Sequence, residues 1–456
     1  MLKIVHPPGY GPERAYAIRV VVEELLGLEC SLEKAWRDDV EITLADGSDG
    51  RVLVADGLFS LPESAWLTEA ALPLLPLEEC DLGGLAARLV SPQLPVLFGG
   101  SPAVHGSPGE VSLGLDVFGS AFFLLTRYEE AVVSARDEHE RFPASESLAL
   151  KGGFLGRPLV NEYVEVLWWA LERVWPRLAR PQRTFRQRPT HDVDIPFCPP
   201  RSLPLALRLA AGDAVRRRDP ALSARRFASF VETKLGRHGS DPCNRFEFLL
   251  AQNERYGLRS AFYFLAGGTA PLDGTYSLED PWIRRLLRRV HERGHEIGLH
   301  PSYETLGDPS RLRSELDALR RACAEEGIDQ PIAGGRQHYL RWENPATWQD
   351  WDDAGLAYDS SLGFADHAGF RCSVCFDYPV FNLRTRRQLS LRERPLVAMD
   401  RTLVAYMELR PEELLEEVAE LKRRCRLFQG DFTLLWHNSM LVTRRERRLY
   451  SDALAL

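Results

Sequence analysis

The sequence has no apolar run that approaches the roughly 18 residues a membrane-spanning helix needs. Its N-terminus, MLKIVHPPGYGPERAY, has no apolar core of the kind found in secretory signal peptides. An excess of positive charge is also missing, because 57 Lys and Arg stand against 65 Asp and Glu for a net charge of −8. These absences argue against an integral membrane protein, an exported one and a broad nucleic-acid binder.

Cysteine patterns that would indicate a metal knuckle are scarce. Cys372 and Cys375 form the single CxxC, and no second pair accompanies it. The other six cysteines are scattered along the chain: Cys30, Cys80, Cys198, Cys243, Cys323 and Cys425. We therefore expect buried or idle thiols, which are typical of a reducing compartment and favour a cytoplasmic protein.

Several common catalytic motifs are absent as well. The chain contains no G-x-S-x-G elbow, P-loop, HExxH or Rossmann fingerprint. What is present is an ordinary globular composition, 45% hydrophobic and 27% charged, over 456 residues. That length is compatible with two or three domains.

The pattern of apolar and polar residues along the chain changes near residue 180. The first part alternates short apolar runs with polar turns and ends in a stretch with apolar residues at helical spacing, VEVLWWALERVW. A Pro- and Arg-rich stretch, PRLARPQRTFRQRP, follows and is the best boundary candidate. We predict a smaller α+β domain over residues 1–182 and a second domain over residues 183–456.

The second domain alternates helices with short β-like runs. Asx-Pro pairs at 280–281, 308–309 and 344–345 each begin a predicted helix, and Gly294, Gly327 and Gly355 end them. The runs SAFYFLAG, HEIGLH, IAGGRQHYL and LAYDSSLG lie between these helices. This alternation predicts an α/β fold with parallel strands, either a barrel or a doubly wound sheet, whose site lies at the carboxyl ends of the strands.

Residues 204–237 interrupt the first strand–helix crossover. They have the pattern of two basic amphipathic helices. A solvated helical insertion is the simpler interpretation, and a lid or a contact with an anionic polymer is the alternative.

Chemically able side chains gather at the predicted strand ends. Asp192 and Asp194, in THDVD, point the same way on an extended chain and repel each other unless a cation or proton lies between them. His300 ends HEIGLH, and Glu304 lies one helical turn further on, so that both can share a metal. The simpler interpretations are a turn or N-cap aspartate pair and, for Glu304, an acid in the first turn of a helix.

Two later strand ends carry further candidates. Arg336 can hold a carboxylate by charge-assisted hydrogen bonds, or it is a surface arginine. His338, two residues on, can ligate a metal, bind substrate or fill space. His437 follows the apolar run FTLLW, where it is placed either as a proton donor or as a hydrogen-bonded core histidine.

In this order the motifs THDVD, GHEIGLHPSYE, GGRQHYL, YDSSLG and LLWHN resemble those of the polysaccharide deacetylase superfamily, the NodB-like domain of carbohydrate esterase family 4. The resemblance covers about residues 185–445 and implies a distorted (β/α) barrel. It implies Asp192 as the catalytic base, Arg336 as the residue that orients it, and His437 as the general acid. It also implies Asp194 and His300 as ligands of a divalent metal ion, with zinc the first choice.

The chain departs from the family at two points. The aspartates are separated by Val193, and Glu304 stands where the family has a second histidine ligand. Either Glu304 replaces that ligand, or another group such as His338 does, or the metal is weak or absent. The metal set carried forward is Asp194, His300 and Glu304.

The motif surroundings imply the substrate class. His338, Tyr339, Asp359 and Trp436 are expected to bind substrate. Sequences around the motifs are similar to a bacterial subgroup found with polysaccharide biosynthesis, whose extra N-terminal domain resembles residues 121–163. The expected activity is metal-dependent removal of an N-acetyl group from an amino sugar or polysaccharide. A metal-poor carbohydrate-binding relative and another linear-amide hydrolase, such as one acting on a ureide, are the alternatives.

Overall fold

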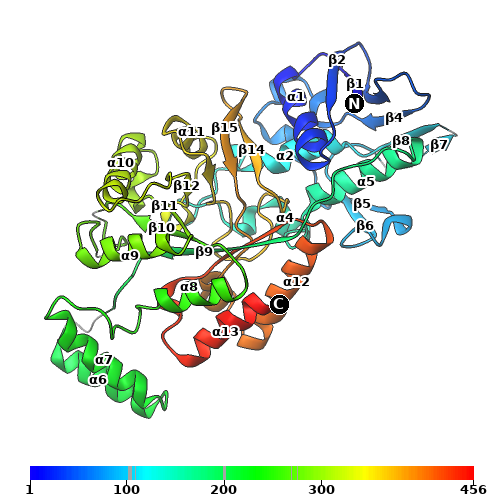
Figure 1. Cartoon of the computed structure of the whole chain (residues 1–456). Coiled ribbons are helices and arrows are strands. Elements are labelled where there is room, and N and C mark those ends of the chain that lie inside the picture. The colour runs from blue at the N-terminus through cyan, green and yellow to red at the C-terminus, as the bar shows by residue number, and fades with distance from the viewer. Residues whose placement is uncertain (101–104, 108, 199–201, 269, 275) are drawn as a thin grey trace. The chain divides into compact units, whose positions relative to one another are not determined.

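The computed structural model describes residues 1–100, 105–107, 109–198, 202–268, 270–274 and 276–456 (Figure 1). It divides into two compact units. Unit 1 comprises Met1–Arg186, Trp342–Val397 and Leu421–Phe432, and unit 2 comprises Gln187–Arg341, Ala398–Glu420 and Thr433–Leu456. Each unit is therefore assembled from segments that are distant in the sequence, whereas the sequence pattern indicated one boundary after residue 182.

Unit 1 contains a six-stranded mixed sheet in the order β2-β1-β3-β4-β8-β7. Its strands are β1 (Leu2–His6), β2 (Cys30–Lys34), β3 (Asp39–Leu44), β4 (Arg51–Ala55), β7 (His105–Ser107) and β8 (Glu110–Leu113). Alternate residues of β1 are buried, as expected for a sheet with one face on the core. Helix α5 (Leu159–Val174) packs on β4 and β8 and supplies that core.

The rest of unit 1 consists of short helices and two small strand groups. The helices are α1 (Gly11–Arg19), α2 (Val117–Leu125), α3 (Tyr128–Val132), α4 (Leu148–Lys151) and α11 (Ala346–Asp353). Strands β5 (Glu78–Asp81) and β6 (Gln93–Val96) pair with each other. Strands β14 (Tyr378–Asn382), β15 (Arg387–Glu393) and β13 (Tyr358–Asp359) lie side by side in that order.

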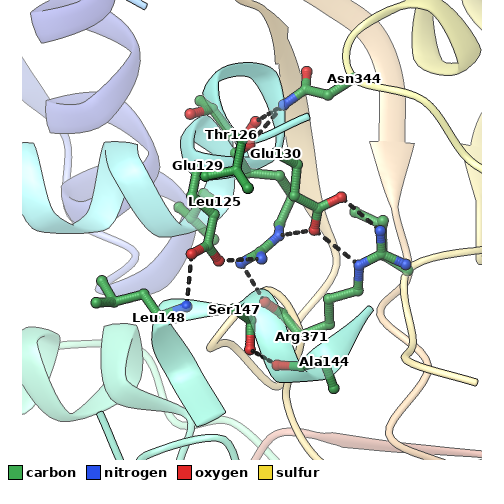
Figure 2. A network of polar contacts seen from close by, with 12 residues as sticks. Leu125, Thr126, Glu129, Glu130, Ala144, Ser147, Leu148, Asn344 and Arg371 are labelled. Atoms are coloured by element: carbon green, nitrogen blue, oxygen red, sulfur yellow. Dashed lines mark hydrogen bonds and ion pairs between the residues drawn. The ribbon is translucent and has the colours of Figure 1, made fainter. Parts of the chain in front are cut away.

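A buried network of charges joins two segments of unit 1 (Figure 2). Glu130 accepts from Arg127 Nε at 2.8 Å and from Arg371 Nη2 at 2.6 Å. Glu129 accepts from Arg127 Nη2 at 2.6 Å and from the backbone N–H of Leu148 at 2.7 Å. All four charged side chains are at most 5% exposed. Two cations and two anions thus balance each other inside the unit.

Unit 2 is built on strands in the order β12-β11-β10-β9-β17-β16. They are β9 (Arg186–Val193), β10 (Ala261–Leu265), β11 (Glu296–His300), β12 (Gly334–Gly335), β16 (Ala398–Met399) and β17 (Asp431–Leu435). The pairs β9–β10, β10–β11, β11–β12 and β16–β17 are parallel. The predicted α/β class with parallel strands is confirmed, and closure into a barrel stays a prediction.

The helices of unit 2 begin and end much as their capping residues predict. They are α6 (Leu203–Val215), α7 (Pro220–Thr233), α8 (Phe246–Arg255), α9 (Pro281–Glu292), α10 (Pro309–Glu325), α12 (Pro411–Leu427, which extends into unit 1) and α13 (Arg444–Ala455). Asp280 accepts from the N–H of Trp282 at 2.8 Å, and Asp308 accepts from that of Arg311 at 3.0 Å. Gly294 and Gly327 follow their helices with φ of 75° and 69°, which only glycine adopts without strain.

The third Asx-Pro pair behaves differently. Asn344 does not cap α11, because its side-chain amide donates to the carbonyls of Thr126 and Arg127 at 2.9 and 2.7 Å. The helix begins at Ala346. Both carbonyls belong to residues more than 200 positions earlier in the sequence, so capping rules, which consider only nearby residues, could not anticipate these hydrogen bonds.

The predicted insertion at 204–237 forms helices α6 and α7, which lie side by side in Figure 1. A disulfide between Cys198, before α6, and Cys243, after α7, joins the two ends of this insertion. This bond corrects the expectation of idle thiols for two of the eight cysteines and weakens the argument for a reducing compartment. Among the described residues, no helix is long and apolar enough to cross a bilayer.

Candidate metal centre

Three metal-binding side chains converge at one end of the unit 2 strands. Asp194 directly follows β9, His300 ends β11, and His338 lies in the turn after β12. Strand β10 lies between β9 and β11, and its residues Phe264 and Leu265 pair with Val193 and His300. Because all these strands are parallel, their carboxyl ends meet, and one donor atom of each of the three lies within 4.8 Å of the others.

Glycine allows the third donor to reach this position. A Cβ atom on Gly335 would overlap the Leu299 carbonyl, so only glycine permits this approach of β12 to β11. The close pairing places Arg336, whose N–H donates to the Leu299 carbonyl at 3.0 Å, and then His338 beside His300.

The ring of His300 is held in one tautomer. Its Nδ1 lies 2.6 Å from the backbone carbonyl of Arg336, and a carbonyl can only accept, so Nδ1 carries the proton. The Nε2 atom is then left facing Asp194 Oδ1 at 3.0 Å and His338 Nδ1 at 2.9 Å. A backbone carbonyl behind the ring is the usual way in which a metal-binding histidine is oriented.

His338 is oriented in the same way. Its Nε2 lies 3.1 Å from the Leu272 carbonyl, which leaves the Nδ1 lone pair pointing at His300. Two nitrogen lone pairs and a carboxylate oxygen at these distances repel one another unless a proton or a cation lies among them. One aspartate and two imidazoles also form a donor set that zinc accepts. The residues present therefore fit a divalent metal ion.

The pKa shifts of Asp194 and His300 are consistent with a proton or cation shared among the donors. Burial alone would raise the pKa of Asp194, but the hydrogen bond from His300 and the nearby imidazoles outweigh it and lower that pKa. Burial would lower the pKa of His300, but Asp192 and Asp194 raise it overall. Without a metal, a proton on His300 relieves the repulsion, and a bound cation would displace that proton. The Asp194 side chain is 24% exposed, so solvent reaches the cluster.

A second carboxylate lies beside the cluster with its own support. Asp192 is buried and accepts from Arg336 Nη1 at 2.9 Å, and the same nitrogen donates to Thr190 Oγ1 at 2.9 Å. The fully buried guanidinium of Arg336 lies over the ring of Tyr263, 5.0 Å from its centroid. The structure thus brings together Asp192 and Arg336, the pair that the sequence resemblance implied.

His437 is paired with a residue that the sequence analysis missed. Asp400, directly after β16, accepts from both the backbone N–H and the Nδ1–H of His437 at 2.7 Å. The ring's Nε2 lies 3.5 Å from Asp194 Oδ2. Burial alone would lower the pKa of His437, but the Asp400 carboxylate and the two other aspartates raise it to about 9. Asp400 could have been found by its position after the apolar run LVAM, the same pattern that marked the other strand ends.

Glu304, predicted as a metal ligand, is not among the three grouped donors, and its role as a ligand stays a prediction. Its side chain is 47% exposed and lies 3.0 Å from Arg311 Nη1. The chain turns at Pro301 and Ser302 and forms a short 3₁₀ turn at Tyr303–Thr305, so the helical spacing assumed from His300 to Glu304 does not exist. His338, expected to bind substrate, is grouped with Asp194 and His300 instead.

The other three predicted substrate residues have different surroundings. Tyr339 is partly exposed and its ring lies edge-on to His338 at 4.7 Å, beside the donor cluster. Trp436 is 1% exposed and packs on Tyr450, and its substrate role stays a prediction. Asp359 belongs to unit 1, where it accepts from the Ser361 hydroxyl and amide, and its substrate role stays a prediction.

His191, next to Asp192, makes the stability of the fold sensitive to acid. Its Nδ1 lies 2.7 Å from the Trp436 carbonyl and its Nε2 lies 2.9 Å from the Asn253 amide nitrogen. Burial lowers the pKa of His191 to about 3. Below pH 6.5, the ordinary pKa of histidine, the unfolded chain therefore binds a proton at His191 that the folded protein does not bind. The free energy of unfolding consequently falls as pH drops toward 3.

We expect His191→Gln to remove about 1.4 kcal/mol per pH unit from the pH dependence of unfolding between pH 6 and 4. The measurement is the urea-induced unfolding free energy of both proteins across that range. Parallel pH profiles for wild type and variant would contradict the assignment of a neutral, buried His191.

One family model and several solved structures are similar to parts of the chain. A family model described as a family of unknown function (DUF7033) matches residues 2–176. No curated protein matches the chain. Among solved structures, a protein provisionally named a polysaccharide deacetylase, from Mycobacterium smegmatis, is similar at 18% identity, covering 61% of this chain and 85% of its own, with a TM-score of 0.39. An allantoinase, PuuE, is similar at 9% identity, covering 61% and 87%, with a TM-score of 0.37. Such values do not establish a shared fold or activity.

Proposed function

We propose that the chain is a metal-dependent hydrolase that removes an N-acetyl group from an amino sugar or polysaccharide. The observation that carries this proposal is the convergence of Asp194, His300 and His338 beside two oriented proton-transfer groups, Asp192 and His437. Metal-assisted hydrolysis of an amide uses these components: a cation site, a base for water and an acid for the departing amine.

Asp194, His300 and His338 would hold the metal, and zinc suits their mixture of one oxygen and two nitrogen donors. Such an ion, when bound, polarises a carbonyl and lowers the pKa of water. The carbonyls of Arg336 and Leu272 keep both rings in the tautomer that offers a lone pair.

Asp192 accepts the proton of the attacking water in this proposal. A base must be held in place, and Arg336 does this by donating to Asp192 Oδ1 inside the protein. Thr190 fixes the same guanidinium nitrogen, so that the carboxylate, the arginine and the strand form one rigid group. This rigidity limits the reorientation that the proton transfer requires.

His437 protonates the departing amine. Asp400 holds its Nδ1–H, which leaves Nε2 as the atom that carries and releases the transferable proton. The raised pKa keeps the ring protonated at neutral pH, as a general acid requires. The products are a free amino sugar and acetate.

The test is acetate release by the zinc-loaded protein from N-acetylated glucosamine oligomers, with a ureide such as allantoin as the competing substrate class. Acetate release supports the proposal, and turnover of the ureide alone replaces it with a different linear-amide hydrolase. Binding of zinc and oligomer without release of acetate would instead indicate a carbohydrate-binding relative. The choice of an N-acetylated sugar, and a place in bacterial surface-polysaccharide metabolism, rest on the sequence resemblance.

Metal content distinguishes the two candidates for the third ligand. We expect His338→Ala to lower zinc affinity at least about tenfold, because one of three ligands is lost. Glu304→Ala, a truncation of a nearby exposed acid, is the matched control and should keep wild-type zinc content. Elemental analysis after dialysis against limiting zinc measures both, and loss of zinc in Glu304→Ala alone would reverse the assignment.

A further inference from the structure

Helices α6 and α7 form a hairpin with a small interior of its own. Its buried positions are Ala206, Ala210 and Asp213 on α6 and Leu222, Arg226 and Ser229 on α7. Asp213 accepts from Arg226 Nε at 2.6 Å and from Arg217 Nη1 at 2.7 Å, which satisfies its carboxylate. Below the hairpin, Asp241 accepts from Ser229 Oγ at 2.9 Å and from the N–H of Cys243, beside the disulfide.

The outward faces of both helices are apolar. On α6, Leu203, Leu207 and Val215 are 46%, 54% and 75% exposed. Along α7 and just past its end, the exposed apolar side chains are Phe227, Val231 and Leu235, at 42%, 46% and 67%. These six are among the fifteen large apolar residues that are exposed in the described part of the chain, and they lie four or eight residues apart along their helices. On α7, Phe227 and Val231 lie opposite the buried positions. A solvated insertion, the simpler expectation from the sequence, would have polar residues there.

The same segment is strongly basic. Residues 203–237 contain eight Lys and Arg against three Asp and Glu, in a chain whose net charge is −8. One of the three acids, Asp213, is neutralised inside the hairpin. Exposed cations border the apolar residues: Arg208, Arg216, Arg218, Lys234 and Arg237. An occupant of these faces must therefore be apolar and must carry negative charge.

We propose that the α6–α7 hairpin docks into the interfacial layer of a lipid membrane with anionic headgroups. A fluid interface covers the outward faces of both helices at once, whereas a second copy of the hairpin would oppose one cationic surface to another. The helices have 13 and 14 residues and are about 20 Å long, too short to cross a hydrocarbon core of about 30 Å. Arginine and lysine stems can cover apolar surface while their charges reach the headgroups.

The test uses the full chain with vesicles of phosphatidylcholine alone and with about 30 mol% phosphatidylglycerol added. Flotation should show binding to the anionic vesicles that weakens as salt rises from about 0.1 to 0.5 M, because the attraction is screened. Phe227→Ser combined with Val231→Ser should lower the binding constant at least about tenfold. Leu74→Ser, at a site 88% exposed in unit 1, is the matched control and should bind as wild type does.

A second variant keeps the test valid if the serine substitutions disturb the fold. Arg208→Glu with Arg216→Glu leaves the hairpin interior untouched and should abolish the preference for anionic vesicles. Thermal unfolding of each variant reports whether the fold is retained. Absence of binding by wild type, or equal binding by wild type and both folded variants, overturns the proposal. A dimer seen by sedimentation velocity and lost in the serine variant would assign the surface to a second copy instead.

Discussion

Replacing Asp192 with asparagine is expected to lower acetate release about 10³-fold while zinc content stays at the wild-type level. Asparagine has the same shape and can still accept from Arg336 Nη1, which now lies 2.9 Å from Asp192 Oδ1. It cannot take a proton from water, so the fall should appear in kcat with little change in KM. Elemental analysis and a coupled acetate assay on the same preparation measure both quantities.

A companion variant separates the base from the ligand. Asp194→Asn should lose zinc as well as activity, because Asp194 supplies the oxygen donor of the cluster. Residual turnover of Asp192→Asn within about threefold of wild type would remove Asp192 from the role of base. Equal loss of zinc in both variants would show that the two carboxylates bind the metal together.

Arg371→Met is expected to destabilise the protein by about 3–5 kcal/mol. Arg371 is 2% exposed, and its removal leaves Glu130, also 2% exposed, with Arg127 as its remaining cationic partner. Burial opposes the ionised form of Glu130, and Arg371 and Arg127 together outweigh it and lower the pKa of that carboxyl. Without Arg371, the ionised Glu130 carboxylate is buried beside one cation instead of two, and this poorly compensated charge destabilises the folded state.

The matched control is Arg51→Met. Arg51 makes an ion pair with Glu110 at 2.6 Å, the same distance as Arg371 with Glu130, but its side chain is 50% exposed. Water screens that pair, so its loss should cost at most about 1 kcal/mol. Urea-induced unfolding of the two variants beside wild type measures the difference. Equal losses would show that burial of the network does not determine its contribution.

Local patterns predicted the helices of unit 2 well. Asp280 and Asp308 cap helices that end just before Gly294 and Gly327, because capping depends on residues two or three positions apart. The same reasoning was wrong for Asn344, whose amide binds carbonyls of a distant segment. The helical spacing assumed between His300 and Glu304 is also absent, because the chain turns at Pro301 and forms a 3₁₀ turn at Tyr303–Thr305.

The strand-end residues divide in the same way, into those found from local sequence and those that depend on contacts distant in the sequence. Asp192, Asp194, Arg336, His300 and His437 were candidates because they lie at the ends of predicted strands, and the family resemblance implied their roles. The position of His338 beside Asp194 and His300 depends on how closely β12 approaches β11. The sequence marks Asp400 as a strand-end residue, but its pairing with His437 depends on the contact between β16 and β17.

By itself, the sequence determined the alternation of strands and helices, the helix ends and the set of residues able to do chemistry, because these depend on neighbours in the chain. The tertiary structure decided which of those residues meet, which segments form each compact unit, which cysteines are bonded and which face of the α6–α7 hairpin is exposed. Those properties depend on contacts between residues far apart in the sequence, which local spacing along the chain does not determine.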